Sequence, residues 1–118
     1  MSITQVIAPN QYTLFSDTNA GGTIDGIKNN TSRIYWISLD NTGNSGAVYV
    51  QLFNNASGNI TVGTSPADFV MYVGGSSQET YNFPIPLAFP AGLSAAVTTT
   101  SGGSSSPSSP VILTIAYN

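Results

Sequence analysis

Hydrophobic and polar residues alternate along most of this chain with the two-residue period of β-strands. The pattern is clearest from Thr31 to Phe53, where two apolar runs flank the polar segment 40–46. That segment is rich in residues that tolerate positive φ or hydrogen-bond their own backbone, so the simplest connection is an antiparallel hairpin with a long loop. Both runs are apolar on both faces. This predicts a central position, covered by a second sheet or by a neighbouring subunit.

Further strands are predicted at 68–73, 93–100 and 111–118, with weaker extended segments at 11–15, 23–28 and 78–83. Three prolines make the stretch after residue 83 extended but unable to form a regular central strand. No long stretch has helical periodicity. The expected fold is therefore an all-β, antiparallel β-sandwich of about eight strands in a single domain.

The beginning of the chain forms a separate part of the pattern, because Pro9 interrupts two short extended pieces. We expect residues 1–15 to be an N-terminal arm or edge strand, and residues 16–118 to be the β-sandwich domain. An edge strand would close one sheet, whereas an arm would reach onto a neighbour. The candidate attachment residues of such an arm are its apolar side chains, Ile3, Val6, Ile7, Tyr12, Leu14 and Phe15.

The tract from 101 to 110, SGGSSSPSSP, is polar and contains no apolar anchor. We predict a solvent-facing loop that is dispensable for folding, since each doubling of loop length costs only about 0.6 kcal/mol.

Composition narrows the range of partners. Charged side chains make up 6% of the chain, against about 25% in an average protein, which indicates a neutral polar surface. Lys28 and Arg33 are the only basic residues, too few to neutralise several phosphates, so we expect no nucleic-acid partner. No apolar run is long enough to span a membrane, so we expect no membrane partner. The segment after Met1 lacks a signal-peptide pattern, which predicts synthesis in a cytoplasm.

The sequence contains no His and no Cys, which removes the commonest general base, the thiol nucleophile and the usual structural zinc ligands. We therefore expect a non-enzymatic protein with no catalytic, cofactor-binding or metal site and no cofactor. Each remaining carboxylate lies in or beside a predicted turn or strand end, where capping and solvation account for it. The alternative is a calcium site built from Asp17, Asp25 or Asp40 with nearby Asn and backbone oxygens, although no D-x-[DN]-x-[DN]-G loop is present.

Tyr35 and Trp36 are adjacent aromatic residues in the middle of a predicted strand. Aromatic residues at such positions usually belong to a core or an interface, and we take these two as a candidate aromatic interface. The alternative is a sugar-stacking platform, which would make the protein a lectin-like binding module.

Four segments in the second part of the chain carry a family resemblance: YVQLFNNAS (49–57), VGTSPADFVMYV (62–73), PAGLSAAVTTT (90–100) and VILTIAYN (111–118). From Tyr49 onward the sequence resembles a module of tailed-bacteriophage virion proteins. Such modules are small β-sandwich proteins that decorate or cement the capsid, or that form parts of fibres and tail appendages. None of the matching residues is catalytic, so the resemblance concerns fold and location rather than chemistry.

The resemblance implies a jelly-roll-like capsid decoration (cement) protein, which stabilises the outer surface of a phage head after synthesis in the host cytoplasm. It further implies a homotrimer that binds the major capsid protein over junctions between its subunits. Because the chain has few charges, we expect attachment through apolar burial and backbone hydrogen bonds, with the arm adding a strand to the partner and with little dependence on salt.

The alternative function is a receptor- or glycan-binding module of a tail fibre or appendage. In that case Tyr35, Trp36 and loop Asn and Asp side chains would bind a glycan receptor. An enzyme that uses a carboxylate pair is not favoured, because His and Cys are missing.

Overall fold

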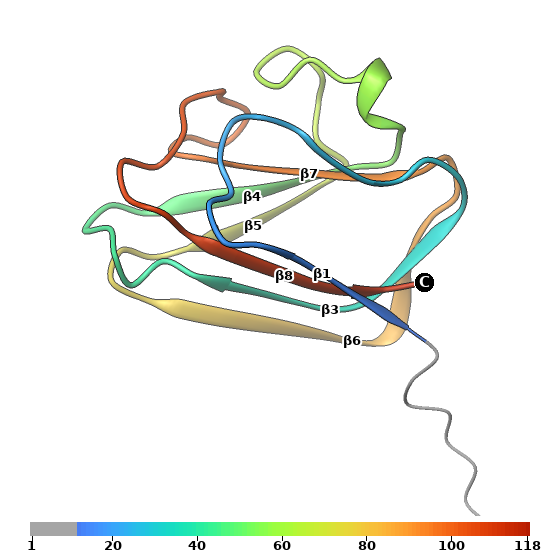
Figure 1. The fold of residues 1–118 in the computed structure, drawn as a ribbon, viewed down its shortest axis with the longest axis horizontal. Helices are drawn as coiled ribbons and strands as arrows, with labels where there is room; N and C mark the ends of the chain where they lie inside the picture. Colours follow the sequence, from blue (N-terminus) through green and yellow to red (C-terminus); the bar gives the residue numbers. More distant parts are fainter. Residues whose placement is uncertain (1–11) are drawn as a thin grey trace, which may run out of the picture.

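A computed structural model describes residues 12–118 of the chain. Within this range, eight strands form two antiparallel four-stranded sheets packed face to face (Figure 1). The strands are β1 (Thr13–Asp17), β2 (Asp25–Lys28), β3 (Ser32–Asp40), β4 (Val48–Phe53), β5 (Phe69–Val73), β6 (Gln78–Phe89), β7 (Leu93–Thr98) and β8 (Ile112–Tyr117), and a 3₁₀ turn, η1, spans Ser57–Asn59. The predicted all-β sandwich of about eight strands is confirmed.

Strand order identifies the architecture. The first sheet has the order β1-β8-β3-β6 and the second sheet the order β2-β7-β4-β5. Every strand thus pairs with its counterpart from the other end of the chain: β1 with β8, β2 with β7, β3 with β6 and β4 with β5. This is the pairing of a long double-stranded ribbon rolled into a sandwich, which is a jelly roll. The expectation of a jelly-roll-like fold is confirmed.

The hairpin predicted for residues 31–53 is wrong, because β3 and β4 lie in different sheets. The connecting loop is long enough to cross between sheets that pack about 10 Å apart. A polar network holds it at the end of the sandwich: Asn41 Nδ2 donates to the carbonyls of Gly46 and Gly74, both at 3.0 Å, and Asn44 Nδ2 donates to Asn41 Oδ1 at 2.9 Å. The predicted central position holds for both strands, and the inner face of each is covered by the opposite sheet.

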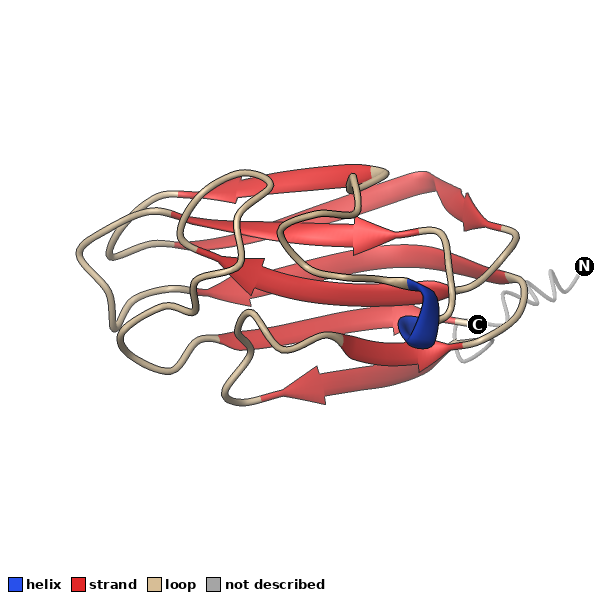
Figure 2. Cartoon of the chain, turned by 90° about the horizontal axis from the view of Figure 1, so that it is seen from above, coloured by secondary structure: helices blue, strands red, loops and turns tan. Residues whose placement is uncertain are grey.

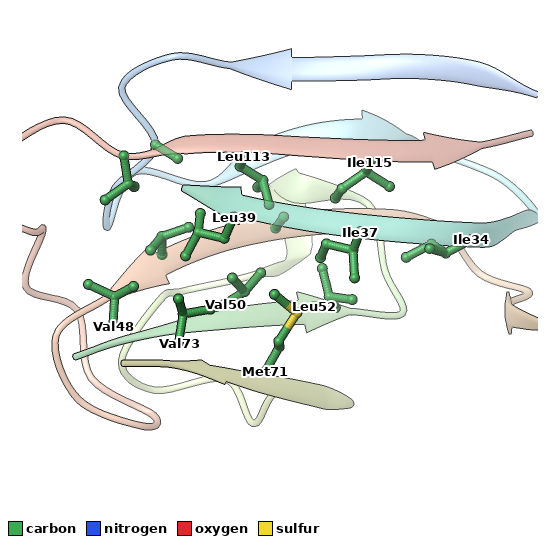
Figure 3. Packing of buried hydrophobic residues seen from close by; sticks show 14 of the residues in the cluster. Ile34, Ile37, Leu39, Val48, Val50, Leu52, Met71, Val73, Leu113 and Ile115 are labelled. Carbon is green, nitrogen blue, oxygen red and sulfur yellow. The ribbon is translucent and has the colours of Figure 1, made fainter. Parts of the chain in front are cut away.

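The hydrophobic core fills the space between the two sheets (Figure 3). Alternate residues of each strand point into it, as the two-residue period requires. Each buried aliphatic side chain contributes about 1.5–3 kcal/mol relative to an exposed one. The largest contributors, none more than 1% exposed, are Ile34, Ile37, Leu39, Leu113 and Ile115 of the first sheet and Val48, Val50, Leu52, Met71, Val73 and Leu93 of the second.

β6 extends through the proline-containing segment because it lies at the edge of the first sheet, where a missing N–H breaks no ladder bond. Opposite Tyr35 of β3 the ladder loses register, and residues 83–86 of β6 bulge out. Phe83 packs edge-to-face against Phe69 of β5, with ring centroids 5.8 Å apart. This contact joins the two sheets along one open side of the sandwich.

The tract 101–110 is exposed, as predicted, but it is firmly anchored. Gln51 Nε2 donates to the Gly103 carbonyl at 3.0 Å, and the Gly22 N–H donates to Ser106 Oγ at 2.9 Å. Asn44 and Ser109 exchange two hydrogen bonds, at 3.0 and 2.8 Å. The prediction that this loop is dispensable considered only apolar anchors. Since two of the anchors, Gln51 and Asn44, are buried polar side chains, we expect the loop to contribute to stability.

Candidate interaction surface

The chain itself covers the outer face of the second sheet. Five outward positions of β4 and β7 are at most 1% exposed, namely Gln51, Phe53, Ser94, Ala96 and Thr98, whereas the outward residue Tyr49 is partly buried. The covering elements are the connections 54–68 and 99–111, and Figure 2 shows η1 and its neighbouring loops in front of the strands. The two connections meet, because a Cβ at Gly63 would lie 3.0 Å from Ser104 Cβ. Most of this face is therefore covered, and the side chains left accessible lie at Tyr49 and on the β5 edge.

No connection within residues 12–118 covers the outer face of the first sheet, which we call the bare face. In Figure 1 the loops of the described chain rise above the second sheet, and none passes below β3 and β6. Cross-strand register sorts the outward side chains into two rows, one of Leu14, Ala116, Trp36 and Asn82 and the other of Ser16, Thr114, Ser38 and Thr80. Large apolar side chains are exposed at both ends of the face, Leu14 by 57% and Ile112 by 42%.

One end of this bare face carries an aromatic patch, made of Tyr12, Leu14, Tyr35 and Trp36. The rings of Tyr12 and Tyr35 are tilted by 36° with centroids 5.7 Å apart, and Asn118 Nδ2 donates to Tyr35 Oη at 2.8 Å. The register of β3 shifts at this point, so that neither Tyr35 nor Trp36 points into the core. The patch therefore presents aromatic area with polar tips, which is typical of binding surfaces.

The structure places the described residues of the predicted attachment arm in two different environments. Tyr12 and Leu14 join Tyr35 and Trp36 in the aromatic patch, whereas Phe15 packs against the core. Residues 13–15 belong to β1, which pairs with β8 at one edge of the first sheet. The remaining predicted arm residues, Ile3, Val6 and Ile7, lie outside the described residues.

Few charges surround the bare face. Arg33 is exposed near the aromatic patch, and Asp40 stands at the opposite end of β3. The Thr42 hydroxyl and N–H donate to Asp40 Oδ1 at 2.6 and 3.0 Å, and these bonds lower the pKa of Asp40 below its usual value. Thr80 Oγ1 donates to Ser38 Oγ at 3.2 Å in the hydroxyl row. Neutral hydroxyl and amide groups thus dominate the polar part of this face.

The fold brings together two carboxylates that their positions in the sequence do not identify as a pair. Asp17 at the end of β1 and Asp25 at the start of β2 occupy inward positions on facing sheet edges, beside a cavity of about 480 Å³. Asp25 Oδ2 is buried and has no hydrogen-bond partner among the described residues. Burial, the Asp17 side-chain hydrogen bond and its charge raise the pKa of Asp25 to about 7. Each residue looked like an ordinary turn residue in the sequence, because only the fold brings the two edges together.

This pair offers little chemistry beyond sharing a proton. Asp40 lies on the outer face of β3, so the three aspartates considered for calcium are not gathered in one place. Within residues 12–118, no group of three potential metal ligands among His, Cys, Asp and Glu occurs. The same residues contain no helix long and apolar enough to cross a membrane.

No protein-family model matches the sequence, and a comparison with curated proteins found no match. Among solved structures, the chain is similar to one described under "Bacillus endospore appendages form a novel family of disulfide-linked pili". The TM-score is 0.40 and the sequence identity 13%, over 98% of this chain and 96% of that chain. A likeness this distant assigns neither a family nor a function.

Proposed function

We propose that the protein is a non-enzymatic structural protein of a bacteriophage particle, a decoration or cement protein on the outer surface of the phage head. The observation that supports this proposal is the bare outer face of the first sheet with its aromatic patch. Its own loops cover most of the second sheet, whereas no connection within residues 12–118 covers the outer face of the first. A protein that acts only by binding a surface requires such a face.

The chemistry of the aromatic patch fits stable attachment. Tyr and Trp bury large areas and satisfy their polar tips, and they dominate the energetics of many interfaces. The patch comes from residues 12–36, whereas the resemblance to virion proteins begins at Tyr49 and covers β4 to β8. In this proposal the resembling half supplies the scaffold, and the preceding segment supplies the surface that recognises a partner.

The partner in this proposal is the major capsid protein, and the resemblance implies a homotrimer over junctions between its subunits. Seven charged residues cannot form an extensive complementary charge pattern. Attachment through apolar burial is little affected by monovalent salt, whereas charge steering is screened within about 10 Å at 0.1 M.

Rebinding to particles stripped of this protein tests the proposal. Trp36→Ala and Tyr35→Ala should each weaken rebinding at least about tenfold, as expected for central aromatic residues of an interface. Tyr81→Ala is a matched control, because Tyr81 is 40% exposed and pairs with the inward residue Ile37 rather than lying on the bare face. Occupancy of the unmodified protein should stay constant up to about 0.5 M sodium chloride.

Three outcomes would contradict this function: full rebinding of both patch variants, a steep loss of occupancy with salt, or density for the protein only on the tail in an electron-microscopy map of its particle. The last result would also favour the alternative function described next.

The second candidate is a receptor- or glycan-binding module of a tail fibre or appendage. It is supported by one observation, that Trp36 and Tyr35 lie outside the core on an open face, as a sugar-stacking platform requires. Glycan-array binding that disappears in Trp36→Ala, with an unchanged circular dichroism spectrum, would favour this candidate over capsid decoration.

A further inference from the structure

The four edge strands of the sandwich differ in how they are protected against pairing with another strand. An edge strand exposes unpaired N–H and C=O groups, and proteins usually protect it with charges, prolines, bulges or short length. β6 contains two prolines and a bulge, and β2 has four residues, a register shift and the charge of Lys28. β1 ends with the carboxylate of Asp17. Three of the four edges are therefore protected.

β5 is also short, with five residues, but it has no charge, proline or bulge of its own. Its sequence, FVMYV, contains no charged residue, proline or glycine, and its ladder with β4 runs without a register shift. In the described part of the chain, β4 supplies all the backbone hydrogen bonds that β5 makes. The outward side chains of β5 are also apolar and exposed, Val70 by 40% and Tyr72 by 55%. β5 is thus an apolar edge strand that can pair with another strand.

We propose that β5 pairs antiparallel with β5 of a second copy of the chain, around a two-fold axis at Met71. In this register Val70 faces Tyr72 of the second copy on the outer side, and Phe69 faces Val73 on the inner side. Pairs of aromatic and β-branched residues are favourable across antiparallel strands. Tyr72 already packs edge-to-face on Tyr49, with ring centroids 5.5 Å apart, so the outer contact extends an existing cluster.

Charge favours the antiparallel direction. Asp68 precedes β5 directly, and a parallel pair in the same register would place the two Asp68 carboxylates side by side. In the antiparallel arrangement each Asp68 faces Gly74 of the other copy, and the two carboxylates lie at opposite ends of the ladder. A strand that is compatible with itself in this way fits a second copy of the same chain.

The resulting dimer joins the two second sheets into one continuous eight-stranded sheet. A two-fold axis perpendicular to that sheet leaves the bare faces of both copies on the same side. Two aromatic patches then face one surface, so a dimer can attach at two points and gain avidity. The inference does not depend on the proposed function, and it replaces the trimer implied by the resemblance with a two-fold dimer.

Sedimentation equilibrium of the full chain at tens of micromolar tests the proposal. The unmodified protein should have the mass of a dimer, and the double variant Val70→Lys/Tyr72→Lys should be a monomer with an unchanged circular dichroism spectrum. Ile85→Lys is the matched control, because Ile85 is 86% exposed and lies on the β6 edge. This control should remain a dimer. A monomeric or trimeric unmodified protein, or a dimeric double-lysine variant, would overturn the proposal.

Cross-linking tests the register, and the absence of cysteine from the chain gives a clean background. Val70→Cys and Tyr72→Cys should not cross-link when each is oxidised alone, because identical positions lie diagonally across the two-fold axis. An equimolar mixture should form a disulfide heterodimer, since directly opposed positions come within disulfide reach. Cross-linking of either single variant, or none in the mixture, would overturn the pairing at Met71. Neither result bears on capsid binding through Trp36, so the two proposals can fail separately.

Discussion

The outer faces of the two sheets differ in how far the chain covers them, although the sheets have the same number of strands and the same pairing rule. The second sheet folds its own connections over Gln51, Ser94 and Thr98, whereas the first sheet leaves Leu14 and Ile112 in solvent. Both faces use uncharged polar residues. On the second sheet these residues are buried and anchor loops, whereas on the first they form a hydroxyl row in which Ser16 and Thr80 are exposed and Ser38 and Thr114 are partly buried. The comparison shows that a polar side chain anchors a loop or stays on the surface according to its burial, and not according to its residue type.

Removing the cover of the second sheet should have the largest effect. Replacing residues 101–110 with a short Gly-containing turn leaves the buried amides of Gln51 and Asn44 without their loop partners. Each unsatisfied buried group costs about 1–3 kcal/mol, so the free energy of unfolding should fall by about 2–5 kcal/mol in denaturant titrations. A loss below about 0.6 kcal/mol, the value for loop length alone, would show that the cover contributes nothing.

A single substitution on each face should show the same difference between the faces, with smaller changes in the free energy of unfolding. Gln51→Ala removes the hydrogen bonds of Nε2 to Thr98 Oγ1, at 2.7 Å, and to the Gly103 carbonyl, and should lower the free energy of unfolding by about 1–3 kcal/mol. Ser38→Ala on the bare face should change it by less than about 0.5 kcal/mol. Equal effects in the two variants would remove the distinction between the faces.

The carboxylates of Asp17 and Asp25, which lie on facing edges of the two sheets, should make stability depend on pH. The folded-state pKa of Asp25 is raised from 3.8 to about 7, so the protonated carboxyl favours the folded state. Its contribution is complete below the unfolded value and is lost as pH rises through the folded value. The melting temperature should therefore fall between about pH 4 and pH 7.5, and Asp25→Asn should flatten this slope.

The comparison protein for this experiment is Asp40→Asn. Hydrogen bonds from Thr42 lower the pKa of Asp40, so its contribution disappears only below about pH 4 and leaves the slope above that value intact. A melting temperature of the unmodified protein that rises across the window would refute the assignment of a raised pKa to Asp25.

The smallest effects on folding are expected on the bare face. Leu14→Ser and Ile112→Ser replace side chains that are 57% and 42% exposed and lie outside the core, so each should change the free energy of unfolding by no more than about 0.5 kcal/mol. Leu14→Ser should nevertheless weaken rebinding to stripped particles, because Leu14 belongs to the aromatic patch. Ile112→Ser, at the other end of the face, shows whether the contact extends beyond that patch.

Local patterns predicted the strands well, but they could not assign them to sheets. Alternation in 32–40, 48–53 and 112–117 is visible because each side chain responds to its own strand. In a jelly roll, two strands that pair can be separated by most of the chain, as β1 and β8 are. The loop after Asp40 suits a hairpin and a crossing between sheets equally, and the burial of Asn41 and Asn44 decides for the crossing.

The candidate surface was predicted in parts. Residue type alone singled out Tyr35 and Trp36, and the apolar pattern of the first fifteen residues included Tyr12 and Leu14. That these four residues lie on one patch could not be predicted, because β1 and β3 share a face only through β8, which lies between them in the sheet. Asp17 and Asp25 were considered as calcium ligands but not as a pair, since they approach each other only after the edges of two different sheets have aligned.

The pairing of β1 with β8 also determines how the domain bears mechanical load. Thr13 lies opposite Tyr117, so tension applied at these two residues opens the ladder like a zipper and breaks its hydrogen bonds one pair at a time. Tension along opposed strands would instead strain all the bonds together. A domain held by this end yields at low force. One held across the bare face spreads the same load over four strands.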